Sequence, residues 1–490
     1  MSAALKPRAS VGLIGQVGVV LTAGLVACAA GVLVSSSAAP FLLIGLAAAI
    51  VLAIAISSVR ASWAMYFVAI SLSGMSVAAG PTSIRPETLA IPLLFLACAR
   101  SWPGTAKSWR DANVATYFVA AIFSVLAISS SALAAPQPAP SLWIALQLML
   151  GIAAYLIVNP VEEAKRSMVL IGTAVVGGIA AISLLSYVGR MFVGLPVEVT
   201  PGVALDNRLI GFSLETNLFA SQSVGWLAVM FCWRKSLPTW SKWMAAVITL
   251  AVLASGTRAA WIALVVILAA IVWTNWRRSR YFIPVTSIAG VLFAVVITSS
   301  FANYDPNDKT SLQWRLLHLL DTDSGTGAYR ANIYETAISD IDTPVRWLFG
   351  TGMNSYSQFH LLDATGVTSA YLSSIWYELL YDVGLIGLAV FVTLMIVIWR
   401  RGHPAGLVLL VTLLLCATST NLFWLTFPWI SLALIPGRKT ALRENSSPDE
   451  LRSPASSPGA RHPQSPNQVD TRSSGLPRLT NAAIEETTHA

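Results

Sequence analysis

The chain contains one run after another of about 20 apolar residues, the length that an α-helix needs to cross the hydrocarbon core of a bilayer. Only 11% of its residues are charged, whereas soluble domains carry about a quarter. These runs predict an all-α fold, a polytopic transmembrane helical bundle. We expect about 12–14 spans, with candidates at 11–34, 40–58, 61–79, 87–99, 112–134, 142–159, 168–188, 216–233, 242–255, 259–275, 281–299, 372–399, 404–419 and 420–436.

Positive charge sets the expected orientation of these spans. Lys and Arg recur after alternate crossings, whereas the intervening connections, such as 35–40 and 135–141, carry no charge. Cytoplasmic loops of membrane proteins hold the excess of Lys and Arg. We therefore expect both termini in the cytoplasm. The basic positions are Lys6, Arg8, Arg60, Arg100, Lys107, Arg110, Lys165, Arg166, Arg234, Lys235, Arg277, Arg278, Arg280, Arg400, Arg401, Arg438 and Lys439.

About seventy residues between two apolar runs are polar and Gly-rich and cannot lie in lipid. The alternation of charge places them outside the cytoplasm, and the other connections are short. The C-terminal tail is rich in Pro and Ser and is predicted to be disordered in the cytoplasm. The expected organisation is a cytoplasmic N-terminus (1–10), transmembrane helices (11–299), a large extracytoplasmic loop (300–371), C-terminal transmembrane helices (372–436) and the tail (437–490).

The formal net charge of +8 comes from many short basic loops and the tail rather than from one stripe. This distribution argues against a nucleic-acid partner. Cys28, Cys98, Cys232 and Cys416 all lie in predicted spans, and no CxxC pair is present. Neither a metal site nor a disulfide framework is indicated.

Two arginines lie at the outer ends of predicted helices. Arg208 stands in DNRLIGFSLETN, just before a span, and Arg258 lies in SGTRAAW, a tight turn between two spans. A cation at membrane depth is costly and is often functional. The planar guanidinium binds phosphate with two parallel hydrogen bonds, so converging arginines would suit a diphosphate. Alternatively, each extends to lipid headgroups or pairs with local acids.

A carboxylate pair follows the large loop. Glu378 and Asp382 are four residues apart in SSIWYELLYDVGLIGL and share one helix face. Two carboxylates this close in a low-dielectric site disfavour double ionisation, a setting for a general base or an arginine partner. The alternative is that Glu378 only bonds a neighbouring helix. His360, in the loop, is either a base or an ordinary loop residue.

The order of these segments resembles the O-antigen ligase and polysaccharide polymerase superfamily of bacterial inner membranes. The resemblance covers roughly residues 200–436. It rests on RLIGFSLETN before a span, SGTRAAW between spans, and a long outer loop containing RANIYETAISDI and WLFGTGMNSY. The last segment is SSIWYELLYDVGLIGL, directly after that loop.

This resemblance implies glycan transfer from a polyprenyl-diphosphate-linked donor to an acceptor hydroxyl, in the assembly of cell-surface polysaccharide. The enzyme would be a glycosyltransferase that works without metal, nucleotide or other cofactor on the outer face of the inner membrane. Its partners would be the lipid-linked donor, a glycan or lipid acceptor, and membrane lipids. The positions that match the family's diphosphate-binding arginines are Arg208, Arg258 and Arg330; the catalytic candidates are Glu378, His360 and Asp382.

One departure separates this chain from the ligases. Many of them carry a His at the start of the helix after the large loop, where this chain has Ser373 and Ser374. The nearest His is His360, well upstream. Either another group acts as base or base catalysis is not essential, and the substitution favours a polymerase over a ligase.

Three other functions compete with this one. A transporter or flippase of lipid-linked saccharides would need polar residues along a path through the bilayer, and the first seven spans hold few beyond Gln16 and Gln147. A non-catalytic envelope-assembly protein, with a tail that recruits partners, is another alternative. A metal-dependent transferase of the polyprenyl-phosphate-sugar class would carry an acidic pair in the first outer loop, which here is SSSAAP.

Overall fold

The computed structural model describes residues 58–75, 77–79, 82–101, 106–196, 202–204, 208–275, 325–360 and 370–437. The predicted spans at 11–34 and 281–299, the span at 40–58 apart from its last residue, and the tail from residue 438 lie outside these ranges. So does the first part of the large loop.

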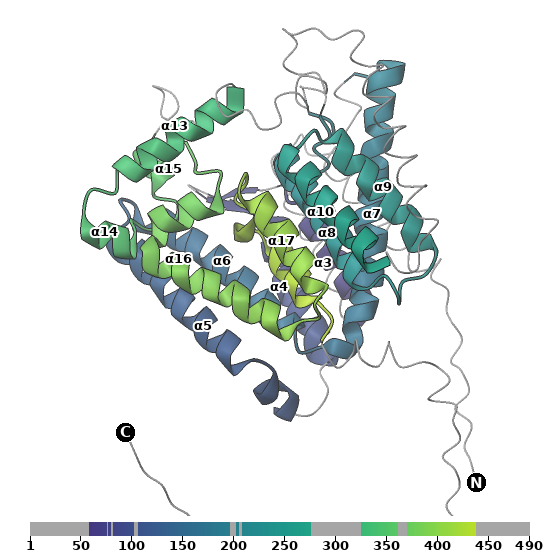
Figure 1. Cartoon of the computed structure of the whole chain (residues 1–490), viewed down its shortest axis with the longest axis horizontal. Helices are drawn as coiled ribbons and strands as arrows, with labels where there is room; N and C mark the ends of the chain where they lie inside the picture. The colour runs from purple at the N-terminus through teal and green to yellow at the C-terminus, as the bar shows by residue number, and fades with distance from the viewer. Residues whose placement is uncertain are drawn as a thin grey trace, which may run out of the picture. The chain divides into compact units, whose positions relative to one another are not determined.

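The described residues form helices and one small hairpin (Figure 1). In the hairpin, β1 (Val77–Ala79) pairs antiparallel with β2 (Thr82–Ile84). The helices are α3 (Val59–Ser71), α4 (Pro86–Ser101), α5 (Ala106–Leu133), α6 (Pro138–Val158), α7 (Glu162–Val193), α8 (Thr216–Cys232), α9 (Trp240–Ala254), α10 (Arg258–Asn275), α13 (Gly325–Ser339), α14 (Pro344–Phe349), α15 (Tyr356–Phe359), α16 (Ile375–Arg401), α17 (Gly406–Ala417), η2 (Leu422–Trp424) and α18 (Thr426–Ala433).

The prediction of an all-α membrane protein is confirmed in this coarse form. Four of the described helices are long and apolar enough to cross a membrane: Val114–Leu133 within α5, and α6, α7 and α16. Shorter apolar helices at Trp240–Ala254, Arg258–Thr274 and Gly406–Ala417 lie where spans were predicted.

Two predicted spans differ from the structure. The run 420–436 is not one helix, because Leu425 is extended (φ −93°, ψ 159°) and separates η2 from the eight-residue α18. The run 61–79 ends as helix at Ser71, and its last residues enter the hairpin. Both segments are apolar, and apolarity alone does not distinguish a spanning helix from chain that is buried among other helices.

Helix α8 lies at the centre of the bundle. It is apolar or small on every side, and all but one of its residues are buried. A helix without a polar face is expected in the interior of a large helical protein. Gly225 brings α8 close to Leu413 of α17, and Gln222 donates to the hydroxyl of Ser71 at 3.2 Å. Small residues at such positions let neighbouring helices approach closely.

The connections that the charge pattern predicts outside the cytoplasm meet at one end of the bundle. The amide of Gly74 donates to the carbonyl of Phe212 (2.8 Å), and the amide of Leu209 donates to that of Ala254 (3.3 Å). These bonds join segments far apart in sequence, as expected if all of them lie on one side of a membrane. We call this the loop end; it carries the described residues among 72–85, 134–141, 194–215, 255–257 and 325–374.

The basic connections meet at the other end. Lys165 is fully buried, donates to Glu162 at 2.6 Å and to the carbonyl of Ile435 at 3.1 Å. Arg166 donates to the carbonyl of Ser236 at 3.1 Å. The alternation of charge along the sequence thus corresponds to two groups of connections at opposite ends of the helices.

The described part of the large loop has a hydrophobic cluster of its own, separate from the core of the bundle. The cluster joins α13 and α15 to the first turns of α16, and Figure 1 shows α13, α14 and α15 gathered at that end of α16. Its buried members are Ile333, Ala337, Ile341, Tyr356, Ala370, Leu372 and Tyr381. The described part of the loop is therefore a folded unit that packs on α16, and it also bonds α5 and α6, through Met353 to Ser131 and through Gln358 to Ser141.

Candidate functional site

Arg208 and Arg258 come from two segments that contact each other. The carbonyl of Arg208 accepts from the amide of Ala204 at 2.8 Å, and the next residue bonds the turn before α10. That turn depends on Gly256, whose φ of 66° is in the left-handed region. Thr257 donates to Asn217 at 3.4 Å, which joins the turn to the start of α8. Both arginine side chains are half-buried.

Arg258 is the first residue of α10, and Thr216 is the first residue of α8. The hydroxyl of Thr257 also reaches the carbonyl of Thr216 at 3.4 Å, so the two helix N-termini lie together. The N-terminus of a helix carries partial positive charge and free N–H groups. The field of two such termini adds to the charge of Arg258 and favours an anion at this place.

Glu215, directly before α8, connects this region to the far end of the sequence. Its Oε1 accepts from the hydroxyl of Thr420 at 2.8 Å, and its Oε2 accepts from the phenol of Tyr371 at 3.4 Å. Burial, together with the Glu215 carboxylate, raises the pKa of Tyr371 to about 12, while the positive charge of Arg330 opposes the rise. Arg330, from α13, therefore lies close enough to act on the same phenol.

The structure thus brings the three predicted arginines to the loop end. Arg208 and Arg258 are linked through the turn before α10, and Arg330 is linked through Tyr371 and Glu215. The sequence analysis did not identify Tyr371 or Thr420 as partners of this region. The bonds of Glu215 reach residues more than 150 positions away in sequence, and no local spacing signals such a contact.

Glu378 and Asp382 lie one turn apart on α16, and both are buried. The Oδ2 of Asp382 accepts from the amide of Asn354 at 2.7 Å, and its carbonyl accepts from the amide of Gly352 at 2.9 Å. Asn354 has φ of 56°, a left-handed conformation that its side chain tolerates. Asp382 therefore holds a tight turn of the loop, and its predicted catalytic role stays a prediction.

Glu378 lies one turn above Asp382, towards the loop end. Its carboxyl lies near the side chain of Asn421, which donates to the carbonyl of Leu372. Only 2% of Glu378 is exposed. The carboxyl is thus enclosed between α16 and the segment before η2.

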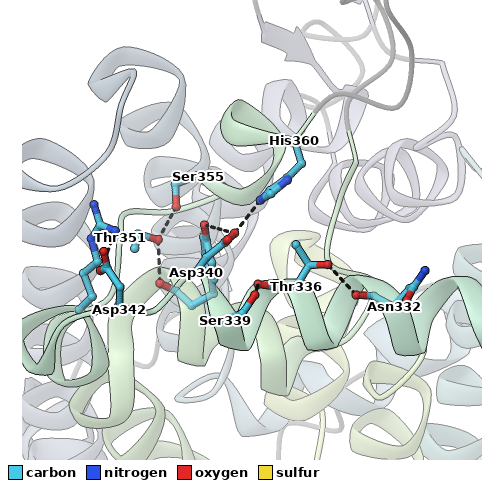
Figure 2. A network of polar contacts seen from close by, with 10 residues as sticks. Asn332, Thr336, Ser339, Asp340, Asp342, Thr351, Ser355 and His360 are labelled. Atoms are coloured by element: carbon cyan, nitrogen blue, oxygen red, sulfur yellow. Dashed lines mark hydrogen bonds and ion pairs between the residues drawn. The ribbon is translucent and has the colours of Figure 1, made fainter.

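His360 is paired with an acid. Its Nε2 lies 2.6 Å from Oδ2 of Asp340, the residue that follows α13 (Figure 2). The phenol of Tyr381 donates to the same oxygen at 3.3 Å. The ring of Tyr356 stacks on the imidazole, with centroids 4.3 Å apart. Burial and the neighbouring Asp340 raise the pKa of Tyr356 to about 12, so this phenol stays neutral.

A short backbone connection joins His360 to the arginine region. The carbonyl of His360 accepts from the amide of Ala370 at 3.0 Å, and the next residue is Tyr371. Nearby, the phenol of Tyr334 bonds the hydroxyl of Ser373 at 3.1 Å. Its ring stacks on Tyr377 with centroids 4.1 Å apart. The imidazole, the three arginines and Glu215 therefore belong to one region of the loop end.

Part of the chain is similar to a known protein family. Residues 243–392 match the model of a protein family described as O-antigen ligase. No match was found among curated proteins. The match confirms the resemblance to the O-antigen ligase superfamily, whose members are glycosyltransferase-like enzymes. Within the matched range are five of the predicted site residues: Arg258, Arg330, His360, Glu378 and Asp382.

Proposed function

We propose that this protein transfers a glycan from a polyprenyl-diphosphate-linked donor to an acceptor hydroxyl on the outer face of a bacterial inner membrane. The family match supports glycan transfer of the ligase or polymerase type. The observation that supports the proposal is the contact at the loop end between the segments of Arg208 and Arg258, beside two helix N-termini, with Arg330 near Tyr371. The proposed site would act in the assembly of a cell-surface polysaccharide.

The arginines are proposed to bind the donor diphosphate. A guanidinium gives a phosphate two parallel hydrogen bonds and keeps its charge at every physiological pH. Arg258 is half-buried at the start of α10, where the N-terminal N–H groups add to its field. The polyprenyl chain of the donor would lie between helices, and its diphosphate would lie at the membrane surface.

The same groups would assist departure of the leaving group. As the acceptor oxygen attacks the anomeric carbon, the bond from that carbon to the diphosphate breaks, and the electron pair stays on the phosphate oxygen. Donors fixed in advance around the growing negative charge lower the barrier without reorganisation. This arrangement assigns charge neutralisation to guanidinium groups, so transfer should need no metal, nucleotide or other cofactor.

Glu215 would keep the arginines apart and in place. Its carboxylate is engaged by Thr420 and Tyr371, so it is a fixed negative charge within the basic region. The acceptor hydroxyl must lose its proton during attack, and Glu378 and His360 are the groups available for it. The folded loop would position both glycans and exclude water, which would limit hydrolysis of the donor.

The first test is the cell-envelope glycan profile of a deletion strain that carries wild-type protein, Arg258→Ala or Arg166→Ala. Arg258→Ala should lose the polymerised or ligated glycan, because removing one preorganised donor lowers the rate on the order of 10²–10³-fold. Arg166→Ala is the matched control. This exposed arginine bonds Ser236 at the basic end of the bundle and should support a normal profile.

Protein level in the membrane is measured in parallel for each variant. Full rescue by Arg258→Ala would overturn the proposal and would favour a transport or assembly role. An unchanged profile in the deletion strain itself would do the same.

A further inference from the structure

His360 and Asp340 lie on different helical segments of the loop, twenty residues apart, and meet at 2.6 Å. Figure 2 shows the imidazole edge directed at the carboxylate. Asp340 immediately follows α13, and His360 immediately follows α15. The pair thus depends on the folding of the loop and not on a local turn.

The carboxylate determines which nitrogen of the ring carries hydrogen. An ionised carboxylate only accepts hydrogen bonds, so Nε2 must be protonated to bond it. In the neutral imidazole the lone pair is then on Nδ1, the nitrogen that is able to take a proton. An acid that fixes the tautomer and orientation of a histidine in this way is a recurring feature of general-base sites.

The groups around the pair fix it further. The phenol of Tyr381, from α16, donates to the same Oδ2 of Asp340 at 3.3 Å. Tyr356, from α15, stacks on the imidazole and limits rotation of the ring. Asp340 and Tyr356 thus contact His360 directly, and Tyr381 bonds the same carboxylate oxygen.

Exposure distinguishes His360 from the other candidate base. The side chain of His360 is 29% exposed, whereas Glu378 is 2% exposed and lies next to Asn421. A sugar hydroxyl must come within about 3 Å of the group that takes its proton. His360 also lies beside Ala370 and Tyr371, which lead to Glu215 and the arginines.

We propose that His360 is the general base that receives the proton of the acceptor hydroxyl and that Asp340 is its positioning residue. This inference rests on the proposed glycan transfer. In the step, the acceptor O–H bond breaks and its proton moves to Nδ1, while the new bond forms between that oxygen and the anomeric carbon. The carbon–oxygen bond to the diphosphate breaks at the same time. The imidazolium that results is stabilised by Asp340.

The test uses the full-length protein reconstituted in lipid vesicles with a polyprenyl-diphosphate-linked glycan and a soluble acceptor glycan. His360→Ala should lower kcat about 10²–10⁴-fold, the usual contribution of a general base, with little change in the KM for the acceptor. Added imidazole should restore part of the transfer rate of His360→Ala. Asp340→Asn should lower kcat without changing KM, because the ring remains but loses its anionic partner.

Asp342→Asn is the matched control. Asp342 is two residues from Asp340 and pairs with Arg346 at 3.0 Å, with both side chains well exposed. It should keep the wild-type kcat and KM. The midpoint of thermal unfolding is measured for every variant, so that loss of folding is separated from loss of the base.

The outcomes distinguish the two proposals. Arg258→Ala at the wild-type rate would overturn the proposed function. If Arg258→Ala is inactive but His360→Ala keeps the wild-type kcat, only the assignment of the base fails. Inactivity of Glu378→Gln together with full activity of Asp340→Asn would assign the base to Glu378 instead. A rise in KM alone for Asp340→Asn would give the pair a binding role and reject the base.

Discussion

Glu215 shows how much a single side chain connects in this protein. One carboxylate oxygen accepts from Thr420 in the segment before η2, and the other accepts from Tyr371 before α16. A hydrogen bond to a charged group contributes about 1.5–3 kcal/mol. The residue thus ties the start of α8 to two segments that come much later in the chain, and it does so next to the arginines.

At high pH, the phenol of Tyr356 should control part of the stability of the loop. Its pKa is raised from about 10 in the unfolded chain to about 12 in the fold. The folded state therefore holds this proton more tightly than the unfolded chain does. The contribution of the protonated phenol to the free energy of unfolding is complete below about pH 10 and is lost as the pH rises towards 12. The midpoint of thermal unfolding should fall less between pH 9 and pH 11 in Tyr356→Phe than in wild type.

The control for that measurement is Tyr377→Phe, which removes a phenol that is 37% exposed and does not act on Tyr356. The unfolding midpoint of this variant should fall with pH as much as that of wild type. If the unfolding midpoint falls equally in wild type and in Tyr356→Phe between pH 9 and pH 11, ionisation of this phenol does not control the stability at high pH.

Sequence reasoning reached some of these residues and missed others for a physical reason. Arg258 was found because a cation between two apolar runs conflicts with the lipid around it, a local signal. Glu378 and Asp382 were placed on one face because helical periodicity is also local, and α16 is helical there. The partner of His360 was missed, since Asp340 and the imidazole meet only through the packing of α13 against α15 and α16.

At the scale of elements, α16 is two helical segments joined at Gly384. This residue has φ of 70° and ψ of −174°, and a Cβ there would collide with the backbone of Leu348 and Phe349. Gly350, on the facing turn, has φ of 78° and lies equally close to the backbone of Asp382. Two glycines therefore let the loop contact α16 backbone to backbone.

Gly384→Ala should destabilise this contact by about 1–3 kcal/mol, through the left-handed conformation and the collision with Leu348. The expected results are a lower midpoint of thermal unfolding and reduced glycan transfer. Gly178→Ala is the matched control, because that position is in the middle of α7 and a Cβ there meets nothing within 4 Å. It should be neutral or stabilising by up to about 1 kcal/mol. Equal unfolding midpoints for the two variants would contradict this account of Gly384.

Element positions were largely predictable because the preference of a 20-residue apolar run for lipid is a property of the run itself. The spans that differ from the prediction lie where tertiary packing determines the backbone conformation. Leu425 is extended within an apolar run because Trp429 is buried and donates to the carbonyl of Phe423 at 2.8 Å, which fixes a bend. Likewise, α14 and α15 of the loop have only six and four residues, which is too short for a periodic pattern to predict them.

For the whole molecule, the two groups of connections make the orientation testable. Arg346 is exposed at the loop end, and Lys235 is exposed at the basic end. In a variant without the four native cysteines, a membrane-impermeant maleimide should label Arg346→Cys in intact spheroplasts. It should label Lys235→Cys only after permeabilisation, because the basic end is expected in the cytoplasm. The reverse pattern would invert the proposed topology and would place the arginines on the wrong side for a transfer at the outer face.

The central position of α8 has a consequence for biogenesis. Helices α17 and α18, which cover it, are the last described helices to be synthesised, and the indole of Trp233 after α8 donates to the carbonyl of Leu434 at 2.8 Å. While the ribosome is still translating residues 234–405, α8 has been made but its later neighbours have not. During that interval, the side of α8 that α17 will cover, including Gly225, faces lipid or a chaperone of the insertion machinery. The bundle closes around its centre only when the chain is nearly complete, so a ribosome that stops early leaves an open assembly and not a smaller working one.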